Sequence, residues 1–439
     1  MLGLVLYSCL VFGFIGISVC GVRTIIKTRT PDPVDFYSAN LFCLSFLHAL
    51  ILIGIPLSII SKCLLGTGLV FLGMTGLKLI KNPNFNINTI VTSWYFWIVS
   101  LTMIFFFKCL LEGIGRWDPR SIYFFHGKII YFAGKFSIEP WKLREIQFSH
   151  QDYPKLTACL AALIATSIGY WNEYWPQMAC GSLMLILQQG VFSLPLKLNQ
   201  KIMIHLVLFS VPGYFLWVGD QDGYLAGFLF LSLIYLGIGM RYQDNLLIRC
   251  GLLNLITAMQ LKNEGLIAAL IVLGISLIIN PTKLIRAGFS TITTGSLSPV
   301  FIWSLYRLNF GIRNDLTIGF KSEAVLSRIV SWNLFWKDFL HYYFLKTSMM
   351  WTMLVGFISF WGLKRCKLWK WDISVTMAFL CCVIYSIVLT FVYLSTHWEV
   401  LEHLKTSVSR VAFTPALMLL GGVLLASPLT RLSKEFQSD

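Results

Sequence analysis

The chain carries charged residues inside or directly beside strongly apolar segments, where ionised side chains are costly and by default functional. The first group covers residues 116–121, RWDPRS. Its two arginines can keep the carboxylate of Asp118 ionised at a membrane surface, where it can act as a general base or bind a metal ion. Trp117 anchors this group, and the same spacing also suits Asp118 as the cap of the next helix.

Two further groups place charges between apolar runs. Residues 262–265, KNEG, connect two short apolar runs and leave no room for a soluble loop. Lys262 and Glu264 therefore belong either to a site at membrane depth or to an ion pair in a tight turn. Asp220 and Asp222 stand two positions apart, so their oxygens suit a divalent cation such as Mg²⁺ or Mn²⁺, and equally a solvated turn.

A polar segment near the C-terminus, residues 397–410, holds the next group. If this segment is helical, His403, Ser407 and Arg410 stand at i, i+4 and i+7 and share one face. An imidazole, a hydroxyl and a guanidinium that face one way suit an anion such as a phosphate. The alternative is a helix that its Trp398 and Arg410 anchor in the membrane interface.

Two more candidate groups lie among aromatic residues. Residues 121–131, SIYFFHGKIIY, predict an aromatic helix on which His126 and Lys128 could meet a phosphate at headgroup depth. The alternative for Lys128 is contact with ordinary anionic lipid. Residues 149–154, SHQDYP, precede an apolar stretch, and Asp152 there also suits the cap of a helix that begins near the proline.

The composition indicates that these groups belong to a membrane protein. Of the 439 residues, 56% are hydrophobic and only 13% are charged, and the mean hydropathy is +0.72. Soluble globular chains carry roughly 25% charged residues. An ordinary cytosolic enzyme, a disordered protein and a disulfide-stapled secreted domain are therefore excluded. The eleven cysteines are scattered and show no metal-ligand spacing.

Apolar runs long enough for a hydrocarbon core of ~30 Å predict about thirteen transmembrane helices. The expected spans are 1–21, 40–61, 63–80, 90–111, 178–196, 202–219, 223–240, 246–261, 266–280, 294–311, 345–363, 373–394 and 411–427. The first of them is expected to be retained rather than cleaved. Residues 156–170 are apolar, but the aromatic belt after them favours a helix that enters one interface without crossing.

The distribution of basic residues predicts the orientation. Short basic connections, such as residues 364–370, are assigned to the cytoplasm. The net charge of +15 is therefore explained by cytoplasmic loops and their contact with lipid headgroups rather than by binding to nucleic acid. The C-terminus is then inside, and the long loops 112–177, 312–344 and 395–410 are outside. Apolar spacing over 323–344 predicts an amphipathic helix that lies in the outer interface.

This topology divides the chain into four segments. They are the N-terminal spans (1–111), the first large outer loop with interfacial helices (112–177), the central membrane core (178–311) and the C-terminal spans with the outer helix and the loop 395–410 (312–439). We find no internal repeat, which weakly disfavours a secondary transporter.

In their order along the chain, these motifs resemble those of bacterial membrane glycosyltransferases of the GT-C superfamily, which use polyprenyl-phosphate-linked sugars. The resemblance covers residues 112–270 and 397–427. It implies an all-α polytopic fold with juxtamembrane helices on the outer face, and it gives Asp118 and Asp222 the positions of the two acidic motifs. The chain differs in having four expected spans before the acidic loop and a lone Asp118 in place of an acidic pair, so the need for Mg²⁺ or Mn²⁺ stays open.

The resemblance also implies roles for the remaining candidates. It implies a donor-phosphate site of Arg120, Lys128, Lys262, His403 and Arg410, supported by Trp117, Asp152, Tyr153, Glu264 and Ser407. Asp118 is expected to accept the proton of an acceptor hydroxyl on a glycan, lipid or protein, with inversion at the sugar carbon. Neither of the common nucleotide-binding glycine motifs occurs, as expected for a lipid-phosphate donor.

Two other classes of function fit the same composition. A transporter or flippase of a lipid-linked or anionic solute would also place charges in the membrane. A non-catalytic assembly subunit is the third possible class, and the ordered series of candidate site residues described above disfavours it. We expect the enzyme, in the plasma membrane of a bacterium, because the charged groups gather at one face rather than along a path.

Overall fold

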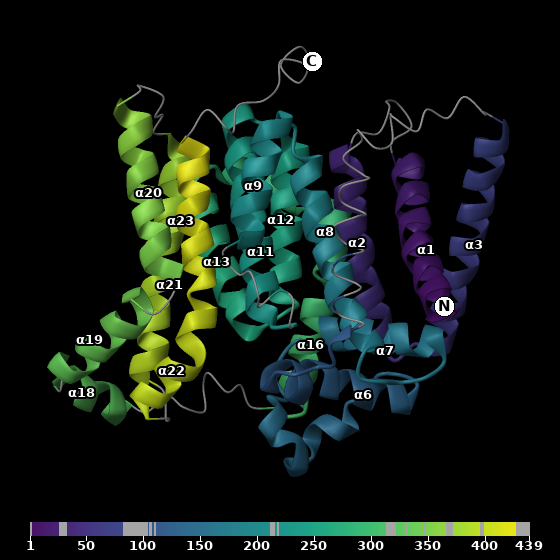
Figure 1. Ribbon diagram of the computed structural model, residues 1–439, viewed down its shortest axis with the longest axis horizontal. Coiled ribbons are helices and arrows are strands. Elements are labelled where there is room, and N and C mark those ends of the chain that lie inside the picture. Colours follow the sequence, from purple (N-terminus) through teal and green to yellow (C-terminus); the bar gives the residue numbers. More distant parts are fainter. Residues whose placement is uncertain are drawn as a thin grey trace. The chain divides into compact units, whose positions relative to one another are not determined.

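A computed structural model of the chain describes residues 2–25, 33–81, 104, 108, 111–210, 216, 219–312, 322–330, 332–345, 348–365, 372–395 and 399–426. Within these ranges all regular elements are helical and no strand occurs (Figure 1). The expected all-α class is therefore confirmed. The chain forms two compact units, each assembled from segments that are distant in sequence.

Within the described ranges, five helices are long and apolar enough to cross a membrane, which indicates a membrane protein. They cover Pro33–Leu52, Leu57–Met74, Gln221–Tyr242, Ile373–Ser395 and Val400–Ala426. The expected number of about thirteen spans is not confirmed, because several apolar helices are shorter than the roughly 20 residues that a bilayer requires. The expected span 90–111 lies largely outside the described residues.

The first unit contains Met1–Leu194, Leu216–Asp220 and Thr291–Phe310. Its helices are α1 (Leu2–Ile25), α2 (Pro33–Leu52), α3 (Leu57–Lys81), α6 (Phe124–Ala133), α7 (Leu156–Ile168), α8 (Met178–Ser193), α15 (Thr291–Ser296) and α16 (Ser298–Asn309). Helices α1 and α3 lie side by side, because Gly13 and Gly68 each leave room for a backbone carbonyl of the other helix. Helix α7, almost all of whose residues are buried, packs against α3, α6 and α8.

Two elements of this unit bear on the expected spans. Helix α7 has 13 residues and ends at Gly169, whose φ of 95° only glycine adopts without strain. It is about 20 Å long and too short for a core of ~30 Å, in agreement with a helix that does not cross. The expected span 294–311 is instead divided into α15 and α16, and the chain leaves α15 just before Pro299 in the first turn of α16.

The second unit contains Pro195–Phe215, Gln221–Ser290 and Gly311–Asp439. Its helices are α9 (Leu198–Ser210), α11 (Gln221–Tyr242), α12 (Asn245–Met259), α13 (Asn263–Ile279), α14 (Pro281–Gly288), α18 (Ser322–Val330), α19 (Trp332–Leu340), α20 (Ser348–Arg365), α21 (Ile373–Ser395), α22 (Val400–Val411) and α23 (Phe413–Ala426). Helix α11 is buried from Gln221 to Met240 and packs against α12, α13, α21 and α23. A helix that is apolar on all sides requires such an enclosure.

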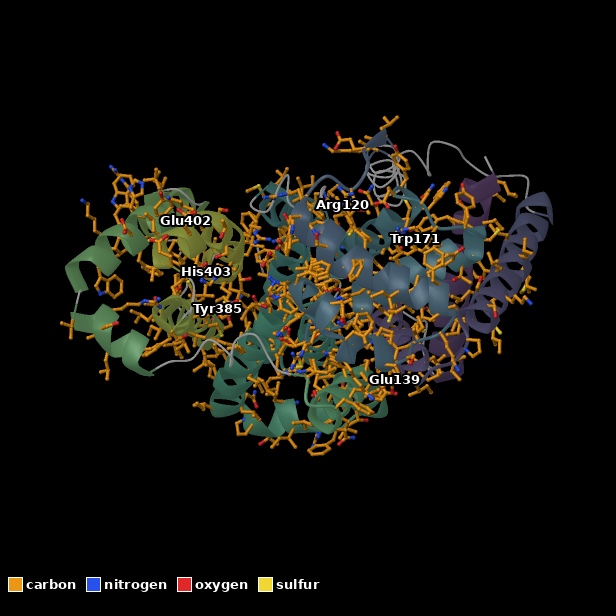
Figure 2. The ribbon with its side chains drawn as sticks, turned by 90° about the horizontal axis from the view of Figure 1, so that it is seen from below. Arg120, Glu139, Trp171, Tyr385, Glu402 and His403 are labelled. Carbon is orange, nitrogen blue, oxygen red and sulfur yellow. The ribbon has the colours of Figure 1, made fainter. Side chains whose placement is uncertain are left out.

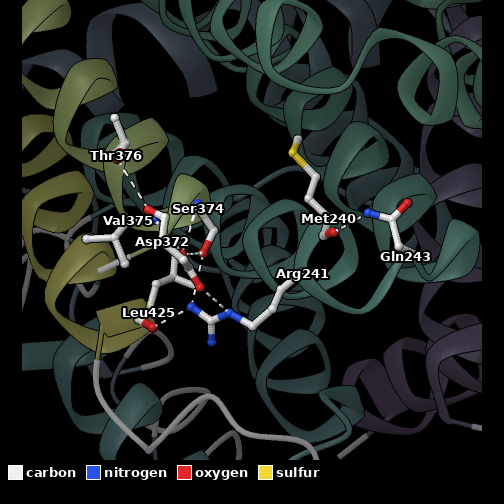
Figure 3. A network of polar contacts seen from close by, with 8 residues as sticks. All are labelled: Met240, Arg241, Gln243, Asp372, Ser374, Val375, Thr376 and Leu425. Atoms are coloured by element: carbon white, nitrogen blue, oxygen red, sulfur yellow. Dashed lines mark hydrogen bonds and ion pairs between the residues drawn. The ribbon is translucent and has the colours of Figure 1, made fainter. Parts of the chain in front are cut away.

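A polar network fixes the C-terminal end of α11 (Figure 3). The guanidinium of Arg241 donates hydrogen bonds to Asp372 Oδ2 (2.6 Å), Ser374 Oγ (3.0 Å) and the Leu425 carbonyl (2.6 Å). Asp372 in turn accepts from the backbone N–H groups of Ser374 and Val375 and so caps α21. Burial would raise the pKa of Asp372, but the hydrogen bonds from Arg241 and Ser374 outweigh it and hold the pKa below its usual value. One arginine thereby joins the ends of α11, α21 and α23.

The amphipathic helix expected over 323–344 is replaced by two shorter helices, α18 and α19, and a π-helical turn at His341–Leu345. Both helices have an apolar face, and Leu326 and Val330 are exposed. Arg328 of α18 donates hydrogen bonds to the carbonyls of Tyr393 (3.3 Å) and Leu394 (2.8 Å). These carbonyls belong to the last turn of α21, which a cation stabilises.

Candidate functional site

Four charged side chains meet in the second unit. Lys262 Nζ lies 2.8 Å from Asp222 Oδ1 and 3.4 Å from Glu264 Oε1. Arg410 Nη1 lies 3.8 Å from the second oxygen of Asp222. We call these four residues the charge tetrad. All four residues were selected from the sequence, which also placed Lys262 and Arg410 in one phosphate site, and the structure brings these two cations to a shared carboxylate.

The tetrad is almost fully enclosed. The side chains of Asp222 and Lys262 are each 5% exposed, and those of Arg410 and Glu264 are 14% and 15% exposed. Removing charges from water costs several kcal/mol per ion, so such a group persists only when opposite charges are paired. The two cations and two carboxylates of the tetrad balance one another formally.

The helices place three of the four tetrad members at an end that favours their charge, whereas the cation Lys262 lies at the N-terminal end of α13. Asp222 lies in the first turn of α11 and Glu264 in the first turn of α13, where the helix dipole favours anions. Arg410 lies in the last turn of α22, where it favours cations. Gly265 allows the close approach of α13 to α12, because a Cβ at this position would overlap the Ala258 carbonyl. The KNEG sequence is thus a helix start rather than only a tight turn.

Aromatic and hydroxyl groups lie beside the tetrad on α21 and α22. The Ser407 hydroxyl donates to the His403 carbonyl (2.7 Å), so it accepts its second hydrogen bond from the Tyr393 hydroxyl (2.8 Å). The rings of Tyr393 and His403 lie 4.9 Å apart. The expected helix over 397–410 is confirmed from Val400 onward. The Ser407 hydroxyl on it is hydrogen-bonded to Tyr393.

Tyr393 and the fully buried Tyr385 were missed by sequence reasoning, because tyrosines at helical spacing in an apolar span look like ordinary core residues. Tyr385, Glu402 and His403, all of the second unit, are labelled in Figure 2. Glu402 is exposed and forms an ion pair of 2.7 Å with Lys405, three positions further along α22. This exposed pair is a useful contrast to the buried tetrad.

Asp118 belongs to the first unit. It precedes the π-helical turn Pro119–Tyr123 and is half-buried, and its side chain makes no capping hydrogen bond. The alternative role of Asp118 as a helix cap is therefore not what the structure shows. Trp117 is 56% exposed, and Arg120 and Lys128 are exposed as well (Arg120 is marked in Figure 2).

The pair Asp220 and Asp222, expected as a metal site or a solvated turn, is divided between the two units. Arg116 donates a hydrogen bond of 2.7 Å to Asp220, whose side chain is 1% exposed. Asp222 instead binds Lys262 and Arg410. In the part of the chain that the structure describes, no three His, Cys, Asp or Glu side chains are grouped so that they could hold a metal ion.

A second buried polar cluster occupies the first unit. Ser149 Oγ donates to the Ile146 carbonyl (2.6 Å), so His126 Nε2, at 3.0 Å, donates to Ser149. His126 is then neutral, and its Nδ1 accepts from Lys155 Nζ at 3.1 Å. Lys155 also donates to the Gln151 carbonyl at 2.9 Å.

Aromatic rings close this cluster. Lys155 is fully buried, and its Nζ lies 4.3 Å from the ring centre of Trp141 and 4.7 Å from that of Trp303. Burial and the charge of Lys155 lower the pKa of His126 well below its usual value, and burial likewise lowers the pKa of Lys155. Of the two residues that the sequence offered as phosphate contacts at headgroup depth, His126 is 1% exposed and lies in this cluster, whereas Lys128 is exposed.

The candidates Asp152 and Tyr153 border this cluster. Asp152 is fully buried, and its carbonyl accepts from the indole N–H of Trp303 at 3.1 Å. The ring of Tyr153 lies 4.9 Å from that of His150 and 6.4 Å from that of Tyr123. Asp152 and Tyr153 therefore hold the loop before α7 in place. The key residue Lys155 was missed, because a single lysine after a proline reads as a surface residue.

Comparisons with models of known protein families, with curated proteins and with solved structures find no match to this chain.

Proposed function

We propose that this chain is an integral-membrane glycosyltransferase that moves a sugar from a polyprenyl-phosphate donor to a hydroxyl of a glycan, lipid or protein. The observation that carries the proposal is the charge tetrad, in which Lys262 and Arg410 converge on one buried carboxylate. An ammonium has three N–H donors and a guanidinium has five. Charged side chains of both kinds form strong hydrogen bonds to phosphates, so we assign the phosphate of the donor lipid to Lys262 and Arg410.

The transfer assigns a role to Asp118 and to the two cations. Asp118 accepts the proton of the acceptor hydroxyl while that oxygen attacks the anomeric carbon of the sugar. The bond between this carbon and the phosphate oxygen breaks, and its electron pair leaves with the lipid phosphate. Lys262 and Arg410 stabilise the negative charge that develops on the leaving phosphate, which is the larger electrostatic contribution.

The tetrad also bears on the choice between cations and a metal ion. Both oxygens of Asp222 already face a cationic side chain. We therefore assign the compensation of the phosphate charge to Lys262 and Arg410. Arg120 and Lys128 are exposed on the first unit and are proposed to contact a lipid headgroup, and the outer face of a bacterial plasma membrane is the proposed location.

The rival function, transport of a lipid-linked or anionic solute, requires polar groups along a path through the membrane. Helix α11 is the enclosed helix of the second unit, and it carries acidic and basic side chains only in its first and last turns. Between Asp222 and Arg241 its buried residues are apolar, small or hydroxyl-bearing. This distribution favours a site at one end over a transport path.

The test is sugar transfer from synthetic polyprenyl-phosphate sugars by the purified full chain in nanodiscs. Lys262→Met is expected to weaken binding of undecaprenyl phosphate by about 10- to 100-fold, as for the loss of hydrogen bonds to a charged group. Lys405→Met is the matched control, because the Lys405 side chain is 41% exposed and its ion pair with Glu402 lies outside the tetrad. Equal binding by both variants, or transport of the lipid without sugar transfer, would contradict the proposal.

A further inference from the structure

The two carboxylates of the charge tetrad differ in how their oxygens are used. Each oxygen of Asp222 faces a cation. Glu264 directs only Oε1 to Lys262, at 3.4 Å. Its Oε2 is buried and accepts no hydrogen bond from any residue that the structure describes. Glu264 is therefore the tetrad member with an unused acceptor.

An unused buried carboxylate oxygen requires an explanation. Burying an ionised oxygen without a donor is costly, and most buried polar atoms in proteins are hydrogen-bonded. The first turn of α13 and Lys262 stabilise the charge of Glu264, but neither provides a donor to Oε2. A ligand that donates a hydrogen bond would satisfy this oxygen.

The position of Glu264 limits what that ligand can be. Its other oxygen contacts the same ammonium to which the proposed function assigns the donor phosphate. In a lipid-phosphate sugar, the ring carbon that carries the phosphate is one bond away from a phosphate oxygen. Hydroxyls on the neighbouring ring carbons therefore come within reach of a carboxylate beside the phosphate site.

We propose that Glu264 Oε2 accepts a hydrogen bond from a hydroxyl of the donor sugar, which makes Glu264 a specificity-determining residue. This inference rests on the proposed function, because it takes the phosphate to bind Lys262. Hydroxyl-to-carboxylate hydrogen bonds are charge-assisted and stronger than neutral ones. A buried acceptor of this kind discriminates strongly against a sugar that lacks the hydroxyl, since the acceptor is then left unpaired.

The experiment compares binding of undecaprenyl phosphate with binding of its glucosyl, galactosyl, mannosyl and arabinosyl derivatives to the full chain in nanodiscs. Wild-type protein is expected to bind at least one derivative about tenfold more tightly than the bare lipid phosphate. In Glu264→Gln this advantage is expected to fall to about twofold or less, because the charge-assisted bond is lost. Binding of the bare lipid phosphate is expected to be unchanged or tighter, since one negative charge has been removed.

Other variants separate failure of this inference from failure of the proposed function. Glu264→Met removes every hydrogen-bonding group and is expected to abolish the advantage, whereas Glu402→Gln on the exposed face of α22 is the control and is expected to retain it. If no derivative binds more tightly than the bare phosphate, or if Glu264→Gln retains the full advantage, Glu264 does not bind the sugar. If Glu264→Gln also loses the bare phosphate, Glu264 acts only by holding Lys262. If Lys262→Met leaves binding of the bare phosphate intact, the phosphate site itself is misplaced.

Discussion

At the scale of single residues, the side chain of Asp222 links Lys262 of α13 to Arg410 of α22. Without this carboxylate, Arg410 would lose the ion pair that joins it to the tetrad, and Lys262 would keep its pair with Glu264. The loss of one partner of a buried ion pair costs far more than the net stability of the pair, because a buried charge is left uncompensated. Asp222 should therefore stabilise the second unit in addition to any role in binding.

We expect Asp222→Asn to lower the free energy of unfolding by about 3 kcal/mol. The control Glu402→Gln breaks an exposed pair on α22 and should cost at most about 1 kcal/mol. Thermal and denaturant unfolding of the detergent-purified variants measures both. Equal stability of the two variants would show that the tetrad does not hold its helices together. The double variant Asp222→Asn/Lys262→Met should regain part of the loss, because it removes one of the unpaired cations.

The cluster of His126 and Lys155 predicts how the stability of the first unit depends on pH. The pKa of His126 lies well below its value of about 6.5 in the unfolded chain. As the pH falls below about 6.5, the unfolded chain therefore binds a proton that the folded chain does not, and stability decreases by up to about 1.4 kcal/mol per pH unit. The lowered pKa of Lys155 acts with the same sign at higher pH.

The measurement is the unfolding temperature between pH 7.5 and pH 5 for the wild type and for His126→Gln. The glutamine amide can still donate to Ser149 and accept from Lys155, but it does not titrate. A flatter pH dependence in the variant is expected. The same slope in both proteins would mean that the pKa of His126 is not lowered in the folded chain.

At the scale of elements, the chain shows what hydropathy predicts and what it does not. The helical class follows from the apolar runs, and the short helix α7 agrees with the expectation that residues 156–170 enter an interface without crossing. Run length did not predict that the expected span 294–311 is divided into α15 and α16. It also did not predict that the amphipathic segment forms the two helices α18 and α19. Helix α16 begins with Pro299 in its first turn, a local signal that apolar run length does not include. Arg328 of α18 bonds to the end of α21, and apolar periodicity carries no information on such tertiary partners.

The candidate site was predictable in part for a similar reason. Charged residues in apolar surroundings are conspicuous, so all four tetrad members were selected from the sequence. Which carboxylate each cation would bind was not predictable, because Asp220 and Asp222 are neighbours in sequence and yet pair with Arg116 and with Lys262. Lys155 and Tyr393 carried no signal, since only their buried partners distinguish them from ordinary surface and core residues.

The network around Arg241 gives a prediction for helix ends. Arg241→Gln should loosen the start of α21, because Asp372 then loses its partner while it caps the N–H groups of Ser374 and Val375. Hydrogen-exchange mass spectrometry should detect faster exchange at the start of α21, by about tenfold for a loss of roughly 1.4 kcal/mol. Arg365→Gln is the control, since Arg365 is exposed and lies over the Trp361 ring. Unchanged exchange in Arg241→Gln would assign the stability of this end to apolar packing alone.

At the scale of the whole molecule, the positive-inside rule predicts the orientation in the membrane. Exposed positions suit its test: Lys128 and Glu402 are expected outside and Lys364 inside. In a background in which all eleven native cysteines are replaced by serine, cysteines at these positions should react accordingly with a membrane-impermeant maleimide on intact cells. Labelling of Lys128→Cys and Glu402→Cys from opposite sides would refute the topology, and with it a shared outer face for Asp118 and the charge tetrad.

The central claim, sugar transfer with Asp118 as the base, is tested most directly by Asp118→Asn. Asparagine is nearly isosteric with aspartate but cannot accept the proton, and Asp118 makes no capping bond whose loss would disturb the turn. We predict that transfer from a polyprenyl-phosphate sugar falls by about 10²- to 10⁴-fold, with unchanged binding of the donor. Asp222→Asn should retain more transfer activity than Asp118→Asn. Full transfer activity in Asp118→Asn would contradict the proposed mechanism, and transport of the lipid-linked sugar would then become the better account of this chain.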